Sequence, residues 1–476
     1  MDKKGKRLFN RRNFLKTLGL STAAGTISFM GCKSGNSGEF VNELPSISEG
    51  EDGKMTYRTM PGTDEKVSIL GYGMMRLPLV EHDKDENEGA EPIHEIDQEM
   101  VNQLVDYALE HGVNYFDTSP RYCKGKSETA TGIALSRHPR NSYVVATKLS
   151  NFDASAQTRE ASMEMYRNSF KALQVDYIDY YLLHSIGNYE NFKARYLDNG
   201  MLDFLVEERK AGRIRYLGWS FHGTKEFFDY MMSLEDNKEY HFDFVQIQMN
   251  YLDWKHSSEV NAEYMYNELT KRGIPSVIME PLRGGGLSNL NNQVLAMMQR
   301  MEPTKSPASW AFRFAGQYPG VLTVLSGMTL MDHLVDNVRT YSPLVPLTEE
   351  ELKMLQDSAV IINDYPLIGC TNCQYCMPCP FGLDIPGIFA HYNKCLNEGL
   401  FATSTTDPEY ARQRRAFLIG YDRAVSKLRQ ADHCTTCGIC QPKCPQKIRI
   451  PREMVKIDHY VENLRQQKDD VEPETK

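Results

Sequence analysis

Eight of the eleven cysteines in this 476-residue chain fall in two short runs near the C-terminus. The first run holds Cys370, Cys373, Cys376 and Cys379, and the second holds Cys434, Cys437, Cys440 and Cys444. A disulfide framework distributes its cysteines across a fold, whereas closely spaced thiolates can converge on one metal centre. The two runs therefore predict metal ligation. Cys32, Cys123 and Cys395 stand alone, and we expect Cys395 to be a small buried residue.

Both runs are Cys-x₂-Cys-x₂-Cys triplets trailed by Cys-Pro, and this spacing resembles the bacterial two-cluster ferredoxins. In that pattern, three thiolates of one run bind a cube and the fourth ligand comes from the other run. The resemblance implies two [4Fe–4S] clusters, one on Cys370, Cys373, Cys376 and Cys444 and the other on Cys434, Cys437, Cys440 and Cys379. The gap between the runs is longer than in small ferredoxins, which leaves this cross-pairing open. Zinc is the alternative, but pairwise ligation leaves the third cysteine of each triplet unexplained.

Four polar residues upstream have the types that acid–base chemistry at a carbonyl requires: Asp117, Tyr122, Lys148 and His184. Reducing a carbonyl needs hydride on carbon and a proton on the developing alkoxide. A free tyrosine has a pKa near 10, and a neighbouring lysine ammonium lowers that pKa while a carboxylate holds the lysine in place. We therefore expect Tyr122 to be the general acid/base, Lys148 to tune it and Asp117 to orient Lys148. His184 would hydrogen-bond the substrate oxygen.

The elements that position these four residues alternate between strand and helix patterns from residue 56 to about 343. Strands are predicted at 67–72, 113–117, 143–148, 178–184, 214–220, 244–249, 276–280 and 321–326, and helices include 98–110, 127–136, 159–173 and 202–211. Eight such repeats predict an α/β fold, a closed (β/α)₈ TIM barrel, with an open doubly wound sheet as the alternative. Asp117, Lys148 and His184 then end the second, third and fourth strands, at the face where such barrels carry chemistry.

At these positions the chain resembles the aldo-keto reductases, through residues 112–122, 145–148 and 181–184. The resemblance implies that the four residues are catalytic and that a nicotinamide cofactor lies across the same face. The cofactor positions it implies are Gly73, Met74, Ser220, Gln246, Pro281, Leu282, Arg283, Gly284, Ser326, Gly327, Met328, His333, Asp336 and Asn337.

Some positions depart from the family pattern. Met279 stands where a nicotinamide-stacking tyrosine is typical, and His222 stands where an asparagine is typical. Gly327 and His333 occupy positions at which many NADP-dependent members carry Lys and Arg for the 2′-phosphate. Without those cations, NAD is at least as well supported as NADP.

The N-terminal sequence has the features of an export signal. The basic stretch containing Arg11 and Arg12 precedes an uncharged apolar run over 17–30, which is too short to span a bilayer. This order resembles a twin-arginine signal, and Gly31-Cys32 resembles a lipoprotein cleavage site. We expect export by that route to the periplasm or its membrane face, with Cys32 as a candidate lipid anchor.

The predicted organisation has six segments: a signal peptide at 1–31, a linker at 32–55, the barrel at 56–345, a connecting helix at 346–368, an α-rich, ferredoxin-like iron–sulfur domain at 369–460, and a tail at 461–476. The acidic stretch 81–99 reads as a solvated loop. Between the cysteine runs, 407–418 and 421–430 read as two helices.

The chain carries a net charge of −9 and no block of Lys or Arg outside its N-terminus, which argues against nucleic acid as a partner. The predicted function is an oxidoreductase that interconverts a carbonyl and an alcohol by hydride transfer with NAD or NADP, with electron transfer through the two clusters. The expected partners are a small carbonyl or alcohol substrate and an electron donor or acceptor, either a protein or a quinone. A conventional cytosolic NADPH-dependent reductase and an electron-transfer module with a silent barrel are the alternatives.

Overall fold

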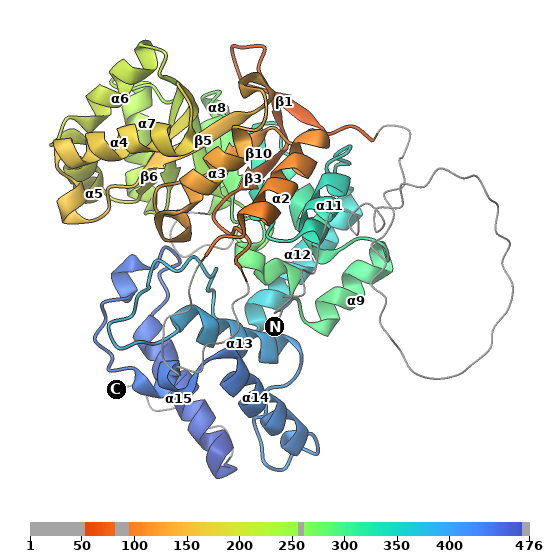
Figure 1. Ribbon diagram of the computed structural model, residues 1–476. Helices are drawn as coiled ribbons and strands as arrows, with labels where there is room; N and C mark the ends of the chain where they lie inside the picture. Colours follow the sequence, from red (N-terminus) through yellow and green to blue (C-terminus); the bar gives the residue numbers. More distant parts are fainter. Residues whose placement is uncertain (1–52, 81–94, 256–260, 469–476) are drawn as a thin grey trace, which may run out of the picture. The chain divides into compact units, whose positions relative to one another are not determined.

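The computed structural model describes residues 53–80, 95–255 and 261–468 (Figure 1). The signal peptide, Cys32, most of the linker, positions 81–94 of the acidic stretch and the end of the tail lie outside the described residues. None of the helices within these ranges is both long and apolar enough to cross a membrane.

In the described part of the chain, eight parallel strands close into a barrel, which confirms the predicted fold and excludes the open sheet. The strands are β3 (Leu70–Gly73), β4 (Tyr115–Asp117), β5 (Val144–Leu149), β6 (Ile178–Ile186), β7 (Ile214–Phe221), β8 (Phe244–Gln248), β9 (Ser276–Met279) and β10 (Val321–Ser326). β10 pairs with both β9 and β3 and so completes the ring. The strands are apolar and almost wholly buried because their side chains face either the barrel interior or the surrounding helices.

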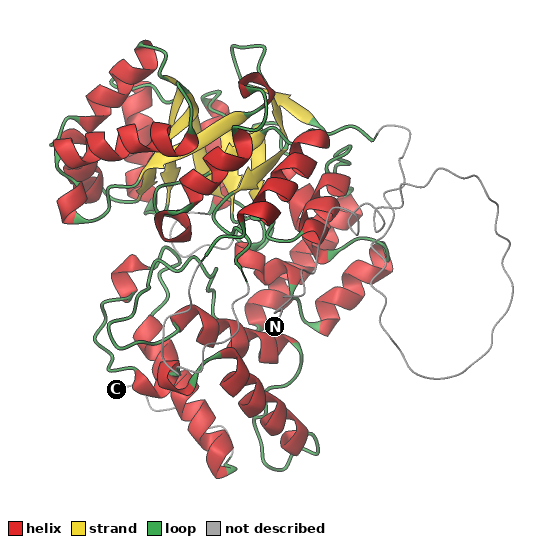
Figure 2. Cartoon of the chain, in the orientation of Figure 1, coloured by secondary structure: helices red, strands yellow, loops and turns green. Residues whose placement is uncertain are grey.

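Helices follow the strands around the outside of the barrel (Figure 2). They are α2 (Gln98–Glu110), α3 (Ser127–Leu135), α4 (Arg159–Leu173), α5 (Tyr189–Phe192), α6 (Met201–Lys210), α7 (Lys225–Asp236), α8 (Ala262–Lys271), α9 (Asn292–Met301), α10 (Pro307–Gly316) and α11 (Met331–Thr340). Several begin at a side chain that accepts a hydrogen bond from a backbone N–H of the first turn, such as Asp97, Thr158 and Thr224. Such caps satisfy N–H groups that have no partner inside the helix.

The strand predicted at 67–72 is divided in the structure. Its first half belongs to a separate hairpin of β1 (Tyr57–Thr59) and β2 (Lys66–Ser68), and only its second half enters the barrel as β3. The division falls at Ser68, whose hydroxyl donates to the Leu70 carbonyl at 2.7 Å. Met60 and Val67 of the hairpin join a core cluster with Tyr115 at the start of β4, so the hairpin contributes to the core at that end of the barrel.

The C-terminal region is α-rich and has a core of its own. It follows α12 (Glu349–Asp364) and contains α13 (Ile385–Asn397), α14 (Tyr410–Ala424) and α15 (Ile450–Gln466). Phe389, Phe417 and Tyr460 are buried in this core, and Cys395 is 3% exposed, as expected.

The two helices predicted at 407–418 and 421–430 are instead the single helix α14 followed by a short turn at Lys427–Arg429. Gly420 lies at the expected break, but it continues the helix. A Cβ at this position would meet the His391 ring at 2.7 Å, so glycine allows the close approach of α13.

Candidate functional site

The four predicted acid–base residues converge at the C-terminal ends of neighbouring strands. Asp117 ends β4, Lys148 and His184 lie near the ends of β5 and β6, and Tyr122 begins the short turn after β4. The Lys148 ammonium donates to Asp117 Oδ1 at 2.5 Å and to the Thr118 carbonyl at 2.8 Å. Its nitrogen lies 4.9 Å from the centre of the Tyr122 ring, and the Tyr122 and His184 rings are 5.8 Å apart and nearly perpendicular.

Burial controls the electrostatics of this group. It raises the pKa of Asp117 and lowers the pKa of Lys148, and in each case the charge of the partner opposes the shift. Burial also raises the pKa of Tyr122 well above its usual value of 10, and the neighbouring Tyr375 and Asp117 add to that rise. The expected lowering of this pKa by Lys148 is therefore not found. Tyr122 keeps its proton at neutral pH, which suits a proton donor.

His184 is held by hydroxyls on one side and faces a tyrosine on the other. Its Nδ1 lies 2.5 Å from Ser150 Oγ and 3.3 Å from Ser119 Oγ, and its Nε2 lies 3.4 Å from the Tyr375 hydroxyl. Burial and then the charge of Lys148 lower the pKa of His184 well below 6.5, so the imidazole is neutral. Sequence reasoning missed both serines. Their signal was position, because each follows a predicted acid–base residue by two places beyond a strand end.

A buried arginine that the sequence did not indicate secures the ends of β5 and β6. Arg195 belongs to a π-helical turn, Lys193–Leu197, and it is wholly buried. Its guanidinium donates to the His184 carbonyl at 2.7 Å, the Tyr196 hydroxyl at 2.8 Å and the Asn151 side chain at 3.1 Å. Arg195 therefore fixes the backbone that carries His184.

The first cysteine run lies at the mouth of the barrel, against the acid–base residues. Tyr375, between Cys373 and Cys376, reaches His184, and its ring centre lies 6.2 Å from that of Phe152. Cys373 is also among the groups whose charge raises the pKa of Tyr122. No sequence pattern predicts this contact, because Tyr375 and His184 are 191 positions apart.

The eight cysteines form two sets, each drawn from both runs. The thiols of Cys370, Cys373, Cys376 and Cys444 line one small cavity between the cysteine runs and α13. After burial, the neighbouring thiols of Cys379, Cys434 and Cys437 raise the pKa of Cys440, which places these four together. Three cysteines from one run thus meet one from the other in both sets, the grouping that the ferredoxin resemblance implies. Across the described ranges, no three His, Cys, Asp or Glu side chains converge closely enough to hold a single metal ion.

The predicted nicotinamide positions lie at the same barrel face, and several already have protein partners. Ser220 Oγ accepts from the Ser185 N–H at 2.7 Å, and the Gln246 amide donates to Asp117 Oδ2 at 3.4 Å. The other paired side chains are Asn337, which donates to Ser326 Oγ, and Asp336, which accepts from Ser306. Met74, Pro281 and Met328 are buried, Gly73, Leu282, Arg283 and Gly284 are half-buried, and Gly327 and His333 are exposed.

A dinucleotide bound at these positions would extend across the barrel face from one to the next. The first cysteine run covers this path. Arg76, after β3, donates to the Thr371 carbonyl at 2.5 Å and to the Asn372 carbonyl at 3.2 Å. On the other side, Thr371 lies so close to Gly284 that a Cβ there would be 2.1 Å from its carbonyl oxygen. Residues 371–372 therefore bridge from the end of β3 to the loop after β9, across the end of β10. As arranged, the residues present do not accommodate an extended dinucleotide along this path.

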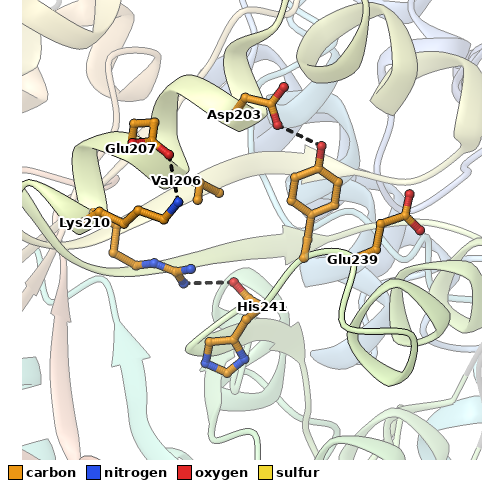
Figure 3. Close-up of a pocket in the computed structure, with 8 residues that line it drawn as sticks. Asp203, Val206, Glu207, Lys210, Glu239 and His241 are labelled. Carbon is orange, nitrogen blue, oxygen red and sulfur yellow. Dashed lines mark hydrogen bonds and ion pairs between the residues drawn. The ribbon is translucent and has the colours of Figure 1, made fainter.

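A separate hollow lies on the outside of the barrel, between α6 and the segment before β8 (Figure 3). It is lined by Asp203, Val206, Glu207, Arg209, Lys210, Glu239, Tyr240 and His241. Its polar groups pair with one another, as in the 2.9 Å bond from Tyr240 to Asp203. These residues precede β7 and β8, at the end of the strands opposite the acid–base residues, and we assign them no chemistry.

Comparison with known proteins yields two family matches. Residues 70–359 match the aldo/keto reductase family, and residues 366–448 match the 4Fe–4S dicluster domain. An uncharacterized oxidoreductase, YqkF of Bacillus subtilis, is 25% identical over 325 residues, covering 63% of this chain and 96% of its own. The protein Tas of Escherichia coli is 26% identical over 338 residues, covering 60% and 93%. The holo form of an aldo-keto reductase from Bacillus halodurans superposes with a TM-score of 0.50 at 24% identity, covering 64% of this chain and 96% of its own, which supports the fold.

Proposed function

Because this chain belongs to the aldo/keto reductase family, we propose that it interconverts a carbonyl and an alcohol at Tyr122 and exchanges electrons through two [4Fe–4S] clusters. The observation that carries the proposal is the meeting of two kinds of site. The complete acid–base group lies at the barrel mouth, and the first cysteine run lies directly against it through Tyr375.

The barrel residues can supply the proton that goes to the substrate oxygen. Reduction of a carbonyl consumes two electrons and two protons; Tyr122 is protonated and would give the proton on oxygen, and solvent would give the proton on carbon. The neutral imidazole of His184 can donate a hydrogen bond to the same oxygen as negative charge develops there. The buried ammonium of Lys148, fixed by Asp117, stabilises the phenolate that Tyr122 becomes.

The two cysteine sets are proposed to hold the clusters in the cross-paired arrangement. When bound, each [4Fe–4S] cluster passes one electron at a time, so two clusters match the two electrons of the reaction. The chain supplies hydrogen bonds to the sulfurs as well as ligands, because the Asn372 N–H donates to Cys370 Sγ at 3.4 Å. Such bonds tune the reduction potential of a cluster.

The nicotinamide that the family resemblance implies, NAD or NADP, stays a sequence-based prediction. No step of the proposed reaction uses this cofactor, because residues 371–372 cover the path along which it would lie. The conventional NADPH-dependent reductase that the sequence left as an alternative requires this path to open.

We propose that the mature protein acts outside the cytoplasm. Support comes from the paired Arg11 and Arg12 before an apolar run, since the twin-arginine route exports proteins that have already folded around their cofactors. A protein or quinone that carries single electrons is the proposed partner, and Cys32 is the proposed lipid anchor.

The proposal is tested with protein purified without oxygen. It should contain about eight irons per chain and reduce a carbonyl when an artificial one-electron donor is supplied. Cys373→Ser should lose about half of the iron, whereas Cys395→Ser, the matched change at a buried non-ligand cysteine, should keep it all. Stoichiometric zinc in place of iron, or no turnover of any carbonyl or alcohol in a broad panel, would contradict the proposal.

A further inference from the structure

The segment at residues 371–375, here called the covering segment, occupies the barrel mouth where the family resemblance places a nicotinamide. It runs between Cys370 and Cys376 and includes Cys373, so its position follows from the same loop that is proposed to bind the first cluster. Three contacts along its length hold it there, two over the part of the predicted cofactor path expected to take the phosphates and one over the reacting end.

The first two contacts lie over the part expected to take the phosphates. Arg76 donates to both the Thr371 and Asn372 carbonyls, so this cation is directed to the protein backbone. Gly284 belongs to the loop that the resemblance assigns to the cofactor, and a Cβ at this position would lie 2.1 Å from the Thr371 carbonyl oxygen. There is no room for a pyrophosphate between two backbones at this separation.

The third contact lies over the reacting end. The Tyr375 hydroxyl reaches His184 Nε2 at 3.4 Å, and the Tyr375 ring centre lies 6.2 Å from that of Phe152. The ring of Tyr375 therefore fills space above the acid–base residues, where a nicotinamide ring and a substrate would otherwise share the mouth.

The cations at this face also give little support to a dinucleotide. Arg76 is directed to the backbone of the covering segment, and Arg283 lies 3.5 Å from the Asp253 carboxylate. Gly327 and His333 add no lysine or arginine for a 2′-phosphate.

We infer that the covering segment takes the place of the nicotinamide cofactor, so that the protein with its clusters bound binds neither NAD nor NADP in its barrel. The inference rests on the proposed function only for the location of the reaction at Tyr122. Because cofactor binding is measured without turnover, failure of this inference can be distinguished from failure of the proposed function.

The direct test is a calorimetric titration of the anaerobic, iron-replete protein with NADH and with NADPH. We expect no saturable binding up to about 1 mM, and no nicotinamide released when the purified protein is denatured. A nicotinamide-dependent aldo-keto reductase without a dicluster domain serves as the positive control. Binding of either nucleotide with a Kd in the micromolar range, or co-purified nicotinamide, would overturn the inference.

Two adjacent glycines provide a test of the covering contact itself. Gly284 and Gly285 both have positive φ, 69° and 98°, so alanine strains the backbone at either position. Only the Gly284 Cβ would meet Thr371, because a Cβ at Gly285 has no neighbour within 4 Å.

Gly284→Ala should therefore displace the covering segment and disturb the first cluster, lowering the iron content and changing its electron paramagnetic resonance signal. Gly285→Ala should leave both unchanged. If the two variants keep equal iron and identical spectra, Thr371 does not lie on Gly284 in the loaded protein and the inference is wrong. Should Gly284→Ala fail to fold, the nucleotide titration of the unaltered protein still decides the matter.

Discussion

At the scale of single residues, the barrel mouth combines a protonated phenol, a neutral imidazole and a buried ion pair. Burial raises the pKa of Tyr122 and lowers that of His184, so both are uncharged at neutral pH, whereas Asp117 and Lys148 stabilise each other at 2.5 Å. A mouth arranged in this way can give a proton to a substrate oxygen without first losing one to water.

The neutrality of His184 leads to a prediction on pH dependence. Burial lowers its pKa well below 6.5, so this imidazole stays unprotonated as the pH falls from 8 to 6. The profile of kcat/KM should therefore show no fall with a midpoint near 6.5. A midpoint near 6.5 that disappears in His184→Asn would contradict this, because it would mean that His184 titrates as an exposed histidine does.

The residues of the mouth differ in how far the sequence could predict them. Tyr122 and His184 were predictable because they follow strands whose periodicity is clear, and strand ends of a parallel barrel meet at one face. Tyr375 was not predictable, because its place depends on how the first cysteine run returns to a barrel that ended many residues earlier. The rise that burial causes in the pKa of Tyr122 was not predictable either, because it depends on the folded environment.

At the scale of elements, the strands and long helices follow from alternation and amphipathic periodicity, and α2, α4 and β10 have the bounds that the sequence predicted. The exceptions have local causes. Ser68 divides the first predicted strand by turning its hydroxyl onto the Leu70 carbonyl, and Gly420 stays helical because His391 packs against it. The π-helical turn that carries Arg195 has no sequence signal, since its residues read as an ordinary helix.

The turn leads to a prediction on stability. Arg195→Met would leave the buried His184 carbonyl and its neighbours without a donor, a change that typically costs about 2–4 kcal/mol. The midpoint of thermal unfolding should fall by about 5 °C or more, and turnover should fall with it because the end of β6 loses its support. Arg137→Met is the control. Arg137 pairs with Asp106 on the surface, with 40% of its side chain exposed, and such pairs contribute less than about 1 kcal/mol. Equal losses in the two variants would argue against a supporting role for Arg195.

At the scale of the whole molecule, the barrel and the C-terminal region meet at the barrel mouth. The acid–base residues lie there, and the C-terminal region brings the first cysteine run onto that mouth through Tyr375 and residues 371–372. The sequence predicted both domains and both cysteine sets, because each has its own spacing. The sequence could not predict that the first cysteine run lies on the barrel mouth, since this contact depends on side chains such as Arg76 that belong to no motif.

This arrangement predicts a preference among substrates. Electrons that arrive singly pass through a half-reduced carbonyl, which costs less energy when its unpaired electron is delocalised. With a one-electron donor, a quinone or a conjugated dicarbonyl should be reduced at least ~10-fold faster than an aliphatic aldehyde of similar size, a difference of about 1.4 kcal/mol in the barrier. Each quinone, or each single carbonyl group of the other substrates, takes up two electrons from the donor and two protons. The rates measured with Tyr122→Phe give the background from direct reaction of the donor with the quinone. If the aldehyde were reduced faster than the quinone, the reductant at the site would be a hydride donor instead.

One experiment tests directly whether the clusters exchange electrons with the barrel site. Protein with its clusters chemically reduced is mixed with a carbonyl substrate in the absence of nicotinamide, and the return of the oxidised cluster absorbance is followed by stopped flow. The unaltered protein should reoxidise and release the alcohol. Tyr122→Phe, which loses only the proton donor, should keep its iron. Its clusters should reoxidise about 10²-fold more slowly than those of the unaltered protein, or more slowly still. Tyr240→Phe, at the hollow on the opposite end of the barrel, should behave as the unaltered protein. Reoxidation of Tyr122→Phe at the unaltered rate, or no reoxidation of the unaltered protein by any carbonyl, would contradict the coupling of the clusters to the barrel site.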